Sequence, residues 1–139
     1  MRLVADTNTI VSALLWRGSP HRLIAAINDY PIAFYTSRVL LDELADVLPR
    51  RKLGKAVRAT GKTSAQLIAE YEGLVNVVAP ASIRRTVPDD EDDDQVLACA
   101  LAARADLIVS GDAHLRNLKR YHGMRIVAAA EALVIIANA

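Results

Sequence analysis

Short apolar runs alternate along this chain with segments whose apolar residues recur every three or four positions. The runs have the length of strands, and the predicted strands cover residues 2–5, 32–35, 76–79, 106–109 and 125–127. The other segments have helical periodicity, and the predicted helices cover residues 8–16, 20–29, 37–50, 64–73, 92–104, 113–119 and 129–137. Strands that alternate with helices form βαβ units, in which the strands run parallel. The sequence therefore predicts an α/β fold, a three-layer sandwich with a mainly parallel central sheet and helices on both faces.

The size and overall charge of the chain exclude several classes of protein. Its 139 residues fit one domain over 1–139, and a formal net charge of +1 gives no overall attraction to nucleic acid or to a membrane. The N-terminus lacks the apolar region of a signal peptide, and no run approaches the roughly 20 apolar residues of a membrane span. Cys99 is the only cysteine, which excludes an internal disulfide, and we expect it in the core of a cytoplasmic protein.

The charged residues are unevenly distributed along the chain. Six acids stand in succession from Asp89 to Asp94, and such a cluster of like charges costs free energy through mutual repulsion. A bound cation would offset that repulsion. Residues 50–62, the basic segment, carry six bases and no acid. The basic segment is either a solvated loop or a surface for RNA phosphates, and its candidates for RNA contact are Arg50, Arg51, Lys52 and Lys55.

Two acids directly follow predicted strands, Asp6 in the stretch VADTN and Asp112 in the stretch IVSGD. In an open parallel sheet, binding sites form outside the carboxyl ends of the strands. If these two strands are neighbours, the two carboxylates meet at one edge of the sheet. Each acid also has a plainer explanation when taken singly, because Asp6 can end a strand or cap a helix and Asp112 is a good N-cap for the next helix.

Two further acids border the apolar side of predicted helices. Glu43 lies three residues after Leu40 in the helix over 37–50, and Asp94 ends its acidic run three residues before Leu97. Each can also be an ordinary acid at the edge of a helix face or complement a helix dipole. Four converging carboxylates form an all-oxygen ligand set, which favours Mg²⁺ or Mn²⁺ over Zn²⁺. Such ions activate water and stabilise the charge that develops in phosphodiester hydrolysis.

The stretches VADTNTIVSALL, TSRVLLDELADVL and DDDQVLACALAARADLIVSGDAHL resemble, in order and spacing, the PIN-domain nucleases. The resemblance runs from Leu3 to about Val127 and is closest to the bacterial VapC-like toxins of toxin–antitoxin pairs. It implies an α/β sandwich around a parallel sheet, with acids that bind Mg²⁺ or Mn²⁺ and cleave RNA. By position, it assigns the metal-binding and catalytic acids as Asp6, Glu43, Asp94 and Asp112.

The resemblance also implies two supporting residues, and the sequence departs from the family pattern at one position. Asn8 and Ser110 occupy positions where small polar residues support the site. Many relatives carry another acid two residues after the acid of the GD pair, where this chain has His114. For His114 we expect an exposed position at the start of a helix, with a direct role as a metal ligand as the alternative. Asp92 or Asp93 is an alternative source of the missing acid.

The C-terminal stretch ALVIIANA is apolar on more than one side of a helix, because Val134, Ile135 and Ile136 are consecutive. It either forms an exposed association patch or is covered by neighbouring helices. The resemblance implies a homodimer and inhibition by a small antitoxin.

The leading functional hypothesis is therefore a metal-dependent ribonuclease, the toxin of such a toxin–antitoxin pair. The alternatives are a PIN nuclease that acts in RNA processing or on structured DNA without an antitoxin, and a catalytically inactive RNA-binding PIN domain.

Overall fold

A single β-sheet forms the centre of the fold. The computed structural model describes residues 1–84, 86 and 91–139, with the backbone alone at residues 91 and 92. Its strands form a 6-stranded sheet in the order β3-β2-β1-β4-β6-β5. Neighbouring strands run parallel except for β5 and β6, which are antiparallel. The strands are β1 (Arg2–Ala5), β2 (Ala33–Thr36), β3 (Asn76–Val77), β4 (Leu107–Val109), β5 (Arg120–Tyr121) and β6 (Met124–Val127).

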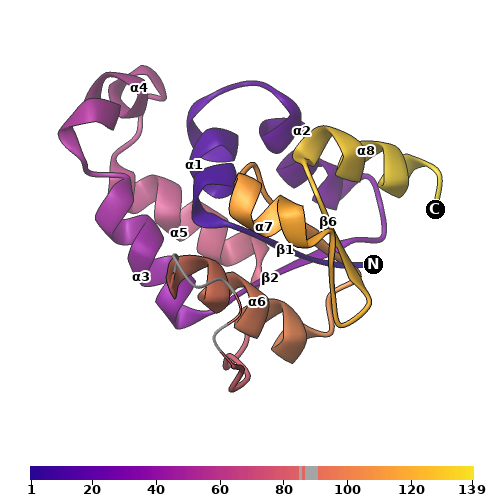
Figure 1. The fold of residues 1–139 in the computed structure, drawn as a ribbon. Coiled ribbons are helices and arrows are strands. Elements are labelled where there is room, and N and C mark those ends of the chain that lie inside the picture. Colours follow the sequence, from indigo (N-terminus) through magenta and orange to yellow (C-terminus); the bar gives the residue numbers. More distant parts are fainter. Residues whose placement is uncertain (85, 87–90) are drawn as a thin grey trace.

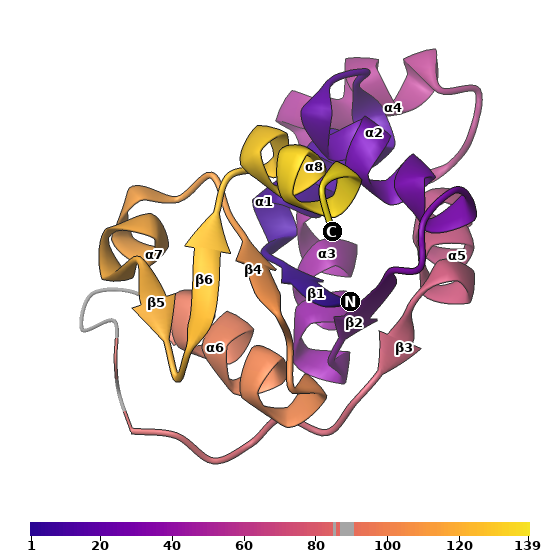
Figure 2. The same ribbon diagram turned by 90° about the vertical axis from the view of Figure 1, so that its right-hand side faces the viewer.

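Helices cover both faces of this sheet. The α-helices are α1 (Thr7–Leu15), α2 (Ser19–Ala25), α3 (Arg38–Val47), α4 (Gly54–Ala59), α5 (Ser64–Leu74), α6 (Glu91–Ala103), α7 (Ala113–Leu118) and α8 (Ala129–Ala137). In Figure 1, α8 lies above the strands and α6 lies below them. Figure 2 shows the strands side by side in the order of the sheet. The predicted α/β sandwich with a mainly parallel sheet is confirmed.

The core is divided by the sheet into two clusters. Leu3 and Ala5 of β1 belong to one cluster, which also contains buried residues of α1, α2, α5 and α8. Val4, between them, belongs to the second cluster, which contains most of the buried residues of α6 and Leu115 of α7. Because successive side chains of a strand point to opposite faces, a fully apolar β1 is the pattern of a strand covered on both sides.

Three short elements were not predicted from the sequence. The basic segment forms a 3₁₀ turn, η2 (Arg51–Leu53), and the helix α4, instead of a loop. Leu53 is partly buried and Val57 is buried, and this four-residue spacing gives the segment one apolar side. Strand β5 was missed because it is only two residues long. It joins β6 through His122 and Gly123, whose φ angles of 48° and 80° form a tight two-residue hairpin turn.

Cys99 lies in the core, as predicted. Its side chain is 0% exposed on α6 and belongs to the cluster that contains Val4. Burial raises the pKa of the Cys99 thiol from 9.0 to about 12, and an interaction with Ser37 lowers it by less. The folded-state pKa is therefore above the unfolded value, and this contribution to stability is complete below about pH 9 and is lost as the pH rises toward 12. At neutral pH the thiol is protonated and unreactive.

The described residues contain no helix that is both long enough and apolar enough to cross a membrane. The longest helix, α6, has 13 residues, whereas a membrane span needs about 20.

Candidate active site

Asp6 is a buried carboxylate at the carboxyl end of β1. The residue is 5% exposed. Its Oδ1 accepts a hydrogen bond of 2.9 Å from the backbone N–H of Thr9, so Asp6 is the N-cap of α1. The hydroxyl of Ser110 donates a hydrogen bond of 2.5 Å to the other carboxylate oxygen, Oδ2. Each oxygen of Asp6 therefore has a defined partner, and the carboxylate is fixed in orientation.

Ser110 links Asp6 to the second strand-end acid, Asp112. Strands β1 and β4 are direct neighbours, with Ala5 opposite Val109, so the condition for the two acids to meet is satisfied. Ser110 is 0% exposed. In addition to its bond to Asp6, its Oγ accepts a hydrogen bond of 2.9 Å from the backbone N–H of Asp112. One buried hydroxyl thus joins the ends of both strands.

Asp112 is the N-cap of α7, as its plainer explanation predicts. Its Oδ1 accepts the backbone N–H of His114 at 2.7 Å and that of Leu115 at 3.4 Å. Asp112 is nevertheless only partly buried, and it lines the same cavity as Asp6. Capping occupies one carboxylate oxygen and orients the other, so the structural role and a ligand role are compatible.

Glu43 reaches the site from α3. The helix begins after Ser37, whose hydroxyl accepts a hydrogen bond of 3.3 Å from the backbone N–H of Leu40. Leu40 and Leu44 are buried, whereas Asp42 is exposed. Glu43 lies between these two sides, is half-buried and lines the cavity. The phase of the apolar stripe therefore places Glu43 at the site, as the sequence predicts.

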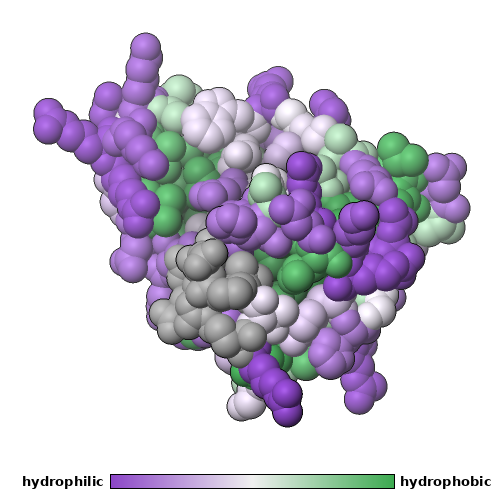
Figure 3. All heavy atoms as spheres, viewed as in Figure 1, coloured by the Kyte–Doolittle hydropathy of each residue, from purple (hydrophilic) through white to green (hydrophobic). Residues whose placement is uncertain are grey.

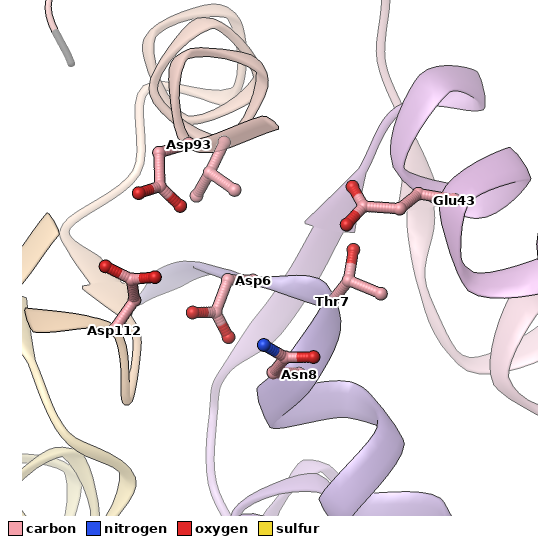
Figure 4. A pocket seen from close by; sticks show the side chains of 7 residues that line it. Asp6, Thr7, Asn8, Glu43, Asp93 and Asp112 are labelled. Atoms are coloured by element: carbon pink, nitrogen blue, oxygen red, sulfur yellow. The ribbon is translucent and has the colours of Figure 1, made fainter. Parts of the chain in front are cut away.

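These acids surround a small polar cavity of about 110 Å³. Its lining residues are Asp6, Thr7, Asn8, Glu43, Asp93, Val96 and Asp112. Figure 4 shows Asp93 and Asp112 on one side, Glu43 on the other and Asp6 between them. Four carboxylates thus converge, two from the segments that follow β1 and β4 and two from α3 and α6.

The structure does not bring Asp94 to this cavity, and Asp93 is present in its place. Asp94 is 7% exposed, and its Oδ1 accepts a hydrogen bond of 3.1 Å from the backbone N–H of Thr86. It lines a different hollow, together with residues 80–83. Successive helical residues are rotated by about 100°, so only one of these two neighbouring acids can face the cavity. Asp93 does so, on the same side of α6 as Val96.

Thr7 has a buried hydroxyl that was not singled out from the sequence. Thr7 is 8% exposed, and among the described residues its Oγ1 has no hydrogen-bond partner. It lines the cavity, and in Figure 4 its hydroxyl points toward Glu43. An unsatisfied buried hydroxyl is costly. A hydrated divalent cation in the cavity would satisfy it, and carboxylate and hydroxyl oxygens are the donors that Mg²⁺ and Mn²⁺ prefer. The residues therefore fit such an ion.

The two residues predicted to support the site, Asn8 and Ser110, occupy different positions. Ser110 is buried and bonded to both strand ends. Asn8 is exposed on the first turn of α1 and lines the cavity itself. His114 is exposed near the start of α7, as predicted. Asp89 and Asp90 lie outside the described residues, as does the side chain of Asp92.

The basic segment lies beyond the C-terminal end of α3, the helix that carries Glu43. Its part α4 protrudes at the upper left of Figure 1, and Figure 3 shows hydrophilic side chains projecting there. Arg50, Arg51, Lys52 and Lys55 are all exposed. Lys62, in contrast, forms an ion pair of 2.8 Å with Glu70.

The sequence matches the PIN domain over residues 2–114. No curated protein matches the chain. The matched range contains all four acids of the cavity, and it covers most of the 139 residues. The chain therefore belongs to the PIN-domain family. PIN domains are typically nucleases and generally use a divalent metal ion, so the cavity is the candidate active site of a nuclease-type domain.

Proposed function

We propose that this chain is a metal-dependent ribonuclease, and that its acidic cavity holds Mg²⁺ or Mn²⁺. The observation that carries the proposal is the convergence of Asp6, Asp93, Asp112 and Glu43 on one cavity that also contains the unsatisfied hydroxyl of Thr7. Four carboxylates around a cavity of 110 Å³ repel one another, and a bound divalent cation would offset that repulsion. Membership of the PIN-domain family independently favours phosphodiester hydrolysis.

The residues of the cavity have different roles in the proposed reaction. Asp6 and Asp112 are fixed by hydrogen bonds and would hold the ion, with Asp93 facing them. When bound, the ion supplies Lewis-acid stabilisation of the phosphate charge and lowers the pKa of bound water. Glu43 lies on the opposite wall, where its carboxylate can accept a proton from an attacking water. Asn8, exposed at the mouth, can donate a hydrogen bond to a phosphate oxygen.

Incubation of the purified chain with end-labelled single-stranded RNA tests this function. Cleavage is expected with Mn²⁺ or Mg²⁺ and is expected to stop when EDTA is added. A single-stranded DNA of the same sequence and a structured DNA in parallel reactions separate a ribonuclease from the alternative PIN nuclease. RNA that is bound but never cut with any of these ions would favour the catalytically inactive RNA-binding domain instead.

We expect the basic segment to contact RNA phosphates. Replacing Arg51, Lys52 and Lys55 with serine should weaken RNA binding and reduce the dependence of the logarithm of the affinity on the logarithm of the salt concentration. Three lost contacts to a single strand should lower that slope by about 2, because fewer counterions are released. Fluorescence anisotropy at several salt concentrations measures both quantities.

The control for this triple variant is its metal affinity. All three side chains are exposed, and none lines the acidic cavity. Mn²⁺ binding and thermal stability should therefore match those of the unaltered chain. A salt dependence identical to that of the unaltered chain would show that the basic segment is only a solvated surface.

The proposal extends to the partners of the chain: a homodimer formed through α8, and inhibition by a cognate antitoxin in the manner of VapC-like toxins. Val134 on α8 is 60% exposed, and Figure 3 shows hydrophobic side chains at the surface in this region, at the right. Ile135 is half-buried and packs against the core, so neighbouring helices cover the apolar end of the chain only in part. An exposed apolar patch of this kind favours association.

Substitution of Val134 by glutamate is expected to convert a dimer into a monomer. The charge falls on a side chain that is 60% exposed in the isolated chain, so folding is preserved while apolar association is lost. Light scattering at micromolar concentration should give about twice the chain mass of 15.1 kDa before the change and about that mass after it. Val39→Glu on α3, where the valine is 44% exposed, is the matched control and should stay dimeric. A monomeric unaltered chain would refute the dimer.

A further inference from the structure

His114 brings a nitrogen donor to the edge of the acidic cavity. It is the second residue of α7, and its backbone N–H bonds to Oδ1 of Asp112 at 2.7 Å. Its ring Nδ1 lies 3.8 Å from that same oxygen. This distance is too long for a hydrogen bond, and within the described ranges the ring has no other hydrogen-bond partner. The imidazole is therefore beside the carboxylate without a hydrogen bond to it.

Asp93 approaches the same point from another element. One donor atom each from Asp93, Asp112 and His114 lie within 4.8 Å of one another. Donor atoms on a single ion, each about 2.1 Å from the metal, are separated by about 3 to 4 Å. The three donor atoms therefore lie within about 1 Å of the spacing of ligands on one ion. The three residues are respectively buried, half-buried and exposed, so the group extends from the floor of the cavity to solvent.

A second observation, on the side of the cavity that carries Glu43, indicates that the cavity takes a ligand. Thr7, 8% exposed, lines the same cavity and has no hydrogen-bond partner for its hydroxyl among the residues that the structure describes. The carboxylates of Asp93 and Asp112 and the ring of His114 together form a mixed oxygen and nitrogen donor set. An all-oxygen set suits Mg²⁺, whereas an imidazole nitrogen suits later transition-metal ions.

We propose that His114 is a metal ligand, together with Asp93 and Asp112, and that it shifts the preference of the site from Mg²⁺ toward transition-metal ions. This inference rests on the proposed metal site and adds the identity of one ligand and its consequence for selectivity. The ring is exposed, so a metal ion can reach it from solvent without any movement of the fold.

Calorimetric titration of the full chain with Co²⁺ and with Mg²⁺, at a fixed pH near 7.5, tests the inference. His114→Asp replaces the nitrogen with oxygen, and the preference for Co²⁺ over Mg²⁺ should fall at least about tenfold, the scale found for changes around metal sites. The visible absorption bands of bound Co²⁺ should also shift, since they report the ligand atoms. His114→Ala should weaken Co²⁺ binding more than Mg²⁺ binding.

Two controls make the outcomes distinguishable. His122→Asn removes another exposed histidine, and asparagine tolerates the positive φ of 48° there, so the preference and the spectrum should not change. Asp112→Asn should weaken the binding of both ions. If Asp112→Asn does so while the His114 variants keep the original preference and spectrum, the inference about His114 is wrong and the metal site stands. If Co²⁺ does not bind the unaltered chain, the inference also fails. If Asp112→Asn binds both ions normally, the proposed site itself is wrong.

Discussion

Replacement of Asp112 by asparagine is expected to lower the rate of RNA cleavage at least about a hundredfold while the chain remains folded. Asparagine has nearly the same shape and is an equally good N-cap, so its side-chain oxygen can still accept the N–H groups of His114 and Leu115. What is lost is the negative charge at the cavity. Removing one group that stabilises charge in a transition state costs about 10² to 10³ in rate.

The measurement is single-turnover cleavage of labelled RNA under limiting Mn²⁺, with the melting temperature recorded for each variant. Asp42→Asn is the matched control, because Asp42 is an exposed acid on α3 beside Glu43 and does not line the cavity. Its cleavage rate should equal that of the unaltered chain. A normal rate for Asp112→Asn would contradict the assignment of the acidic cavity as the active site.

A comparison of Asp93→Asn with Asp94→Asn should give the second largest difference in the rate of RNA cleavage. The two acids are neighbours on α6 and are almost equally buried, at 5% and 7% exposed. Only Asp93 lines the acidic cavity. We expect Asp93→Asn to lower cleavage about a hundredfold and to weaken Mn²⁺ binding at least about tenfold. Asp94→Asn should change either quantity by no more than a few-fold.

This pair of variants distinguishes two orientations of α6. Asparagine at position 94 can still accept the backbone N–H of Thr86, so Asp94→Asn retains this local contact. The reverse result, with Asp94→Asn inactive and Asp93→Asn active, would mean that α6 is rotated by about one residue, or 100°. The position assigned by resemblance to the PIN-domain nucleases would then be the correct one.

The contrast between Glu43 and Asp94 shows why the sequence placed one acid and not the other. On α3, buried Leu40 and Leu44 alternate with exposed Asp42, so the hydrophobic pattern defines which side faces the core. On α6, every residue from Val96 to Ala100 is at most 4% exposed. When a helix is apolar on nearly all sides, its hydrophobic pattern does not define which side faces the sheet. The periodicity therefore cannot place an acid near the start of such a helix.

The meeting of Asp6 and Asp112 followed from general rules of parallel sheets, once β1 and β4 were known to be neighbours. The sequence alone did not fix that order, because pairing between distant strands depends on packing across the whole sheet. The hydroxyl of Thr7 had a visible signal, since it directly follows Asp6 at the strand end. The approach of His114 to Asp93 had no signal in the hydrophobic pattern, because it joins α7 to α6, with β4 between them in the sequence. The resemblance alone connected the two positions, through the acid that relatives carry where this chain has His114.

Calorimetric titration with Mn²⁺ tests most directly whether the acidic cavity is a metal site. It should be carried out on the unaltered chain, on the double variant Asp6→Asn/Asp112→Asn and on Asp42→Asn. We expect saturable binding by the unaltered chain and by Asp42→Asn, and a loss of at least about a hundredfold in affinity for the double variant, on the scale of tenfold or more for each change. Equal Mn²⁺ affinity in all three folded proteins would contradict the metal site and the ribonuclease mechanism built on it.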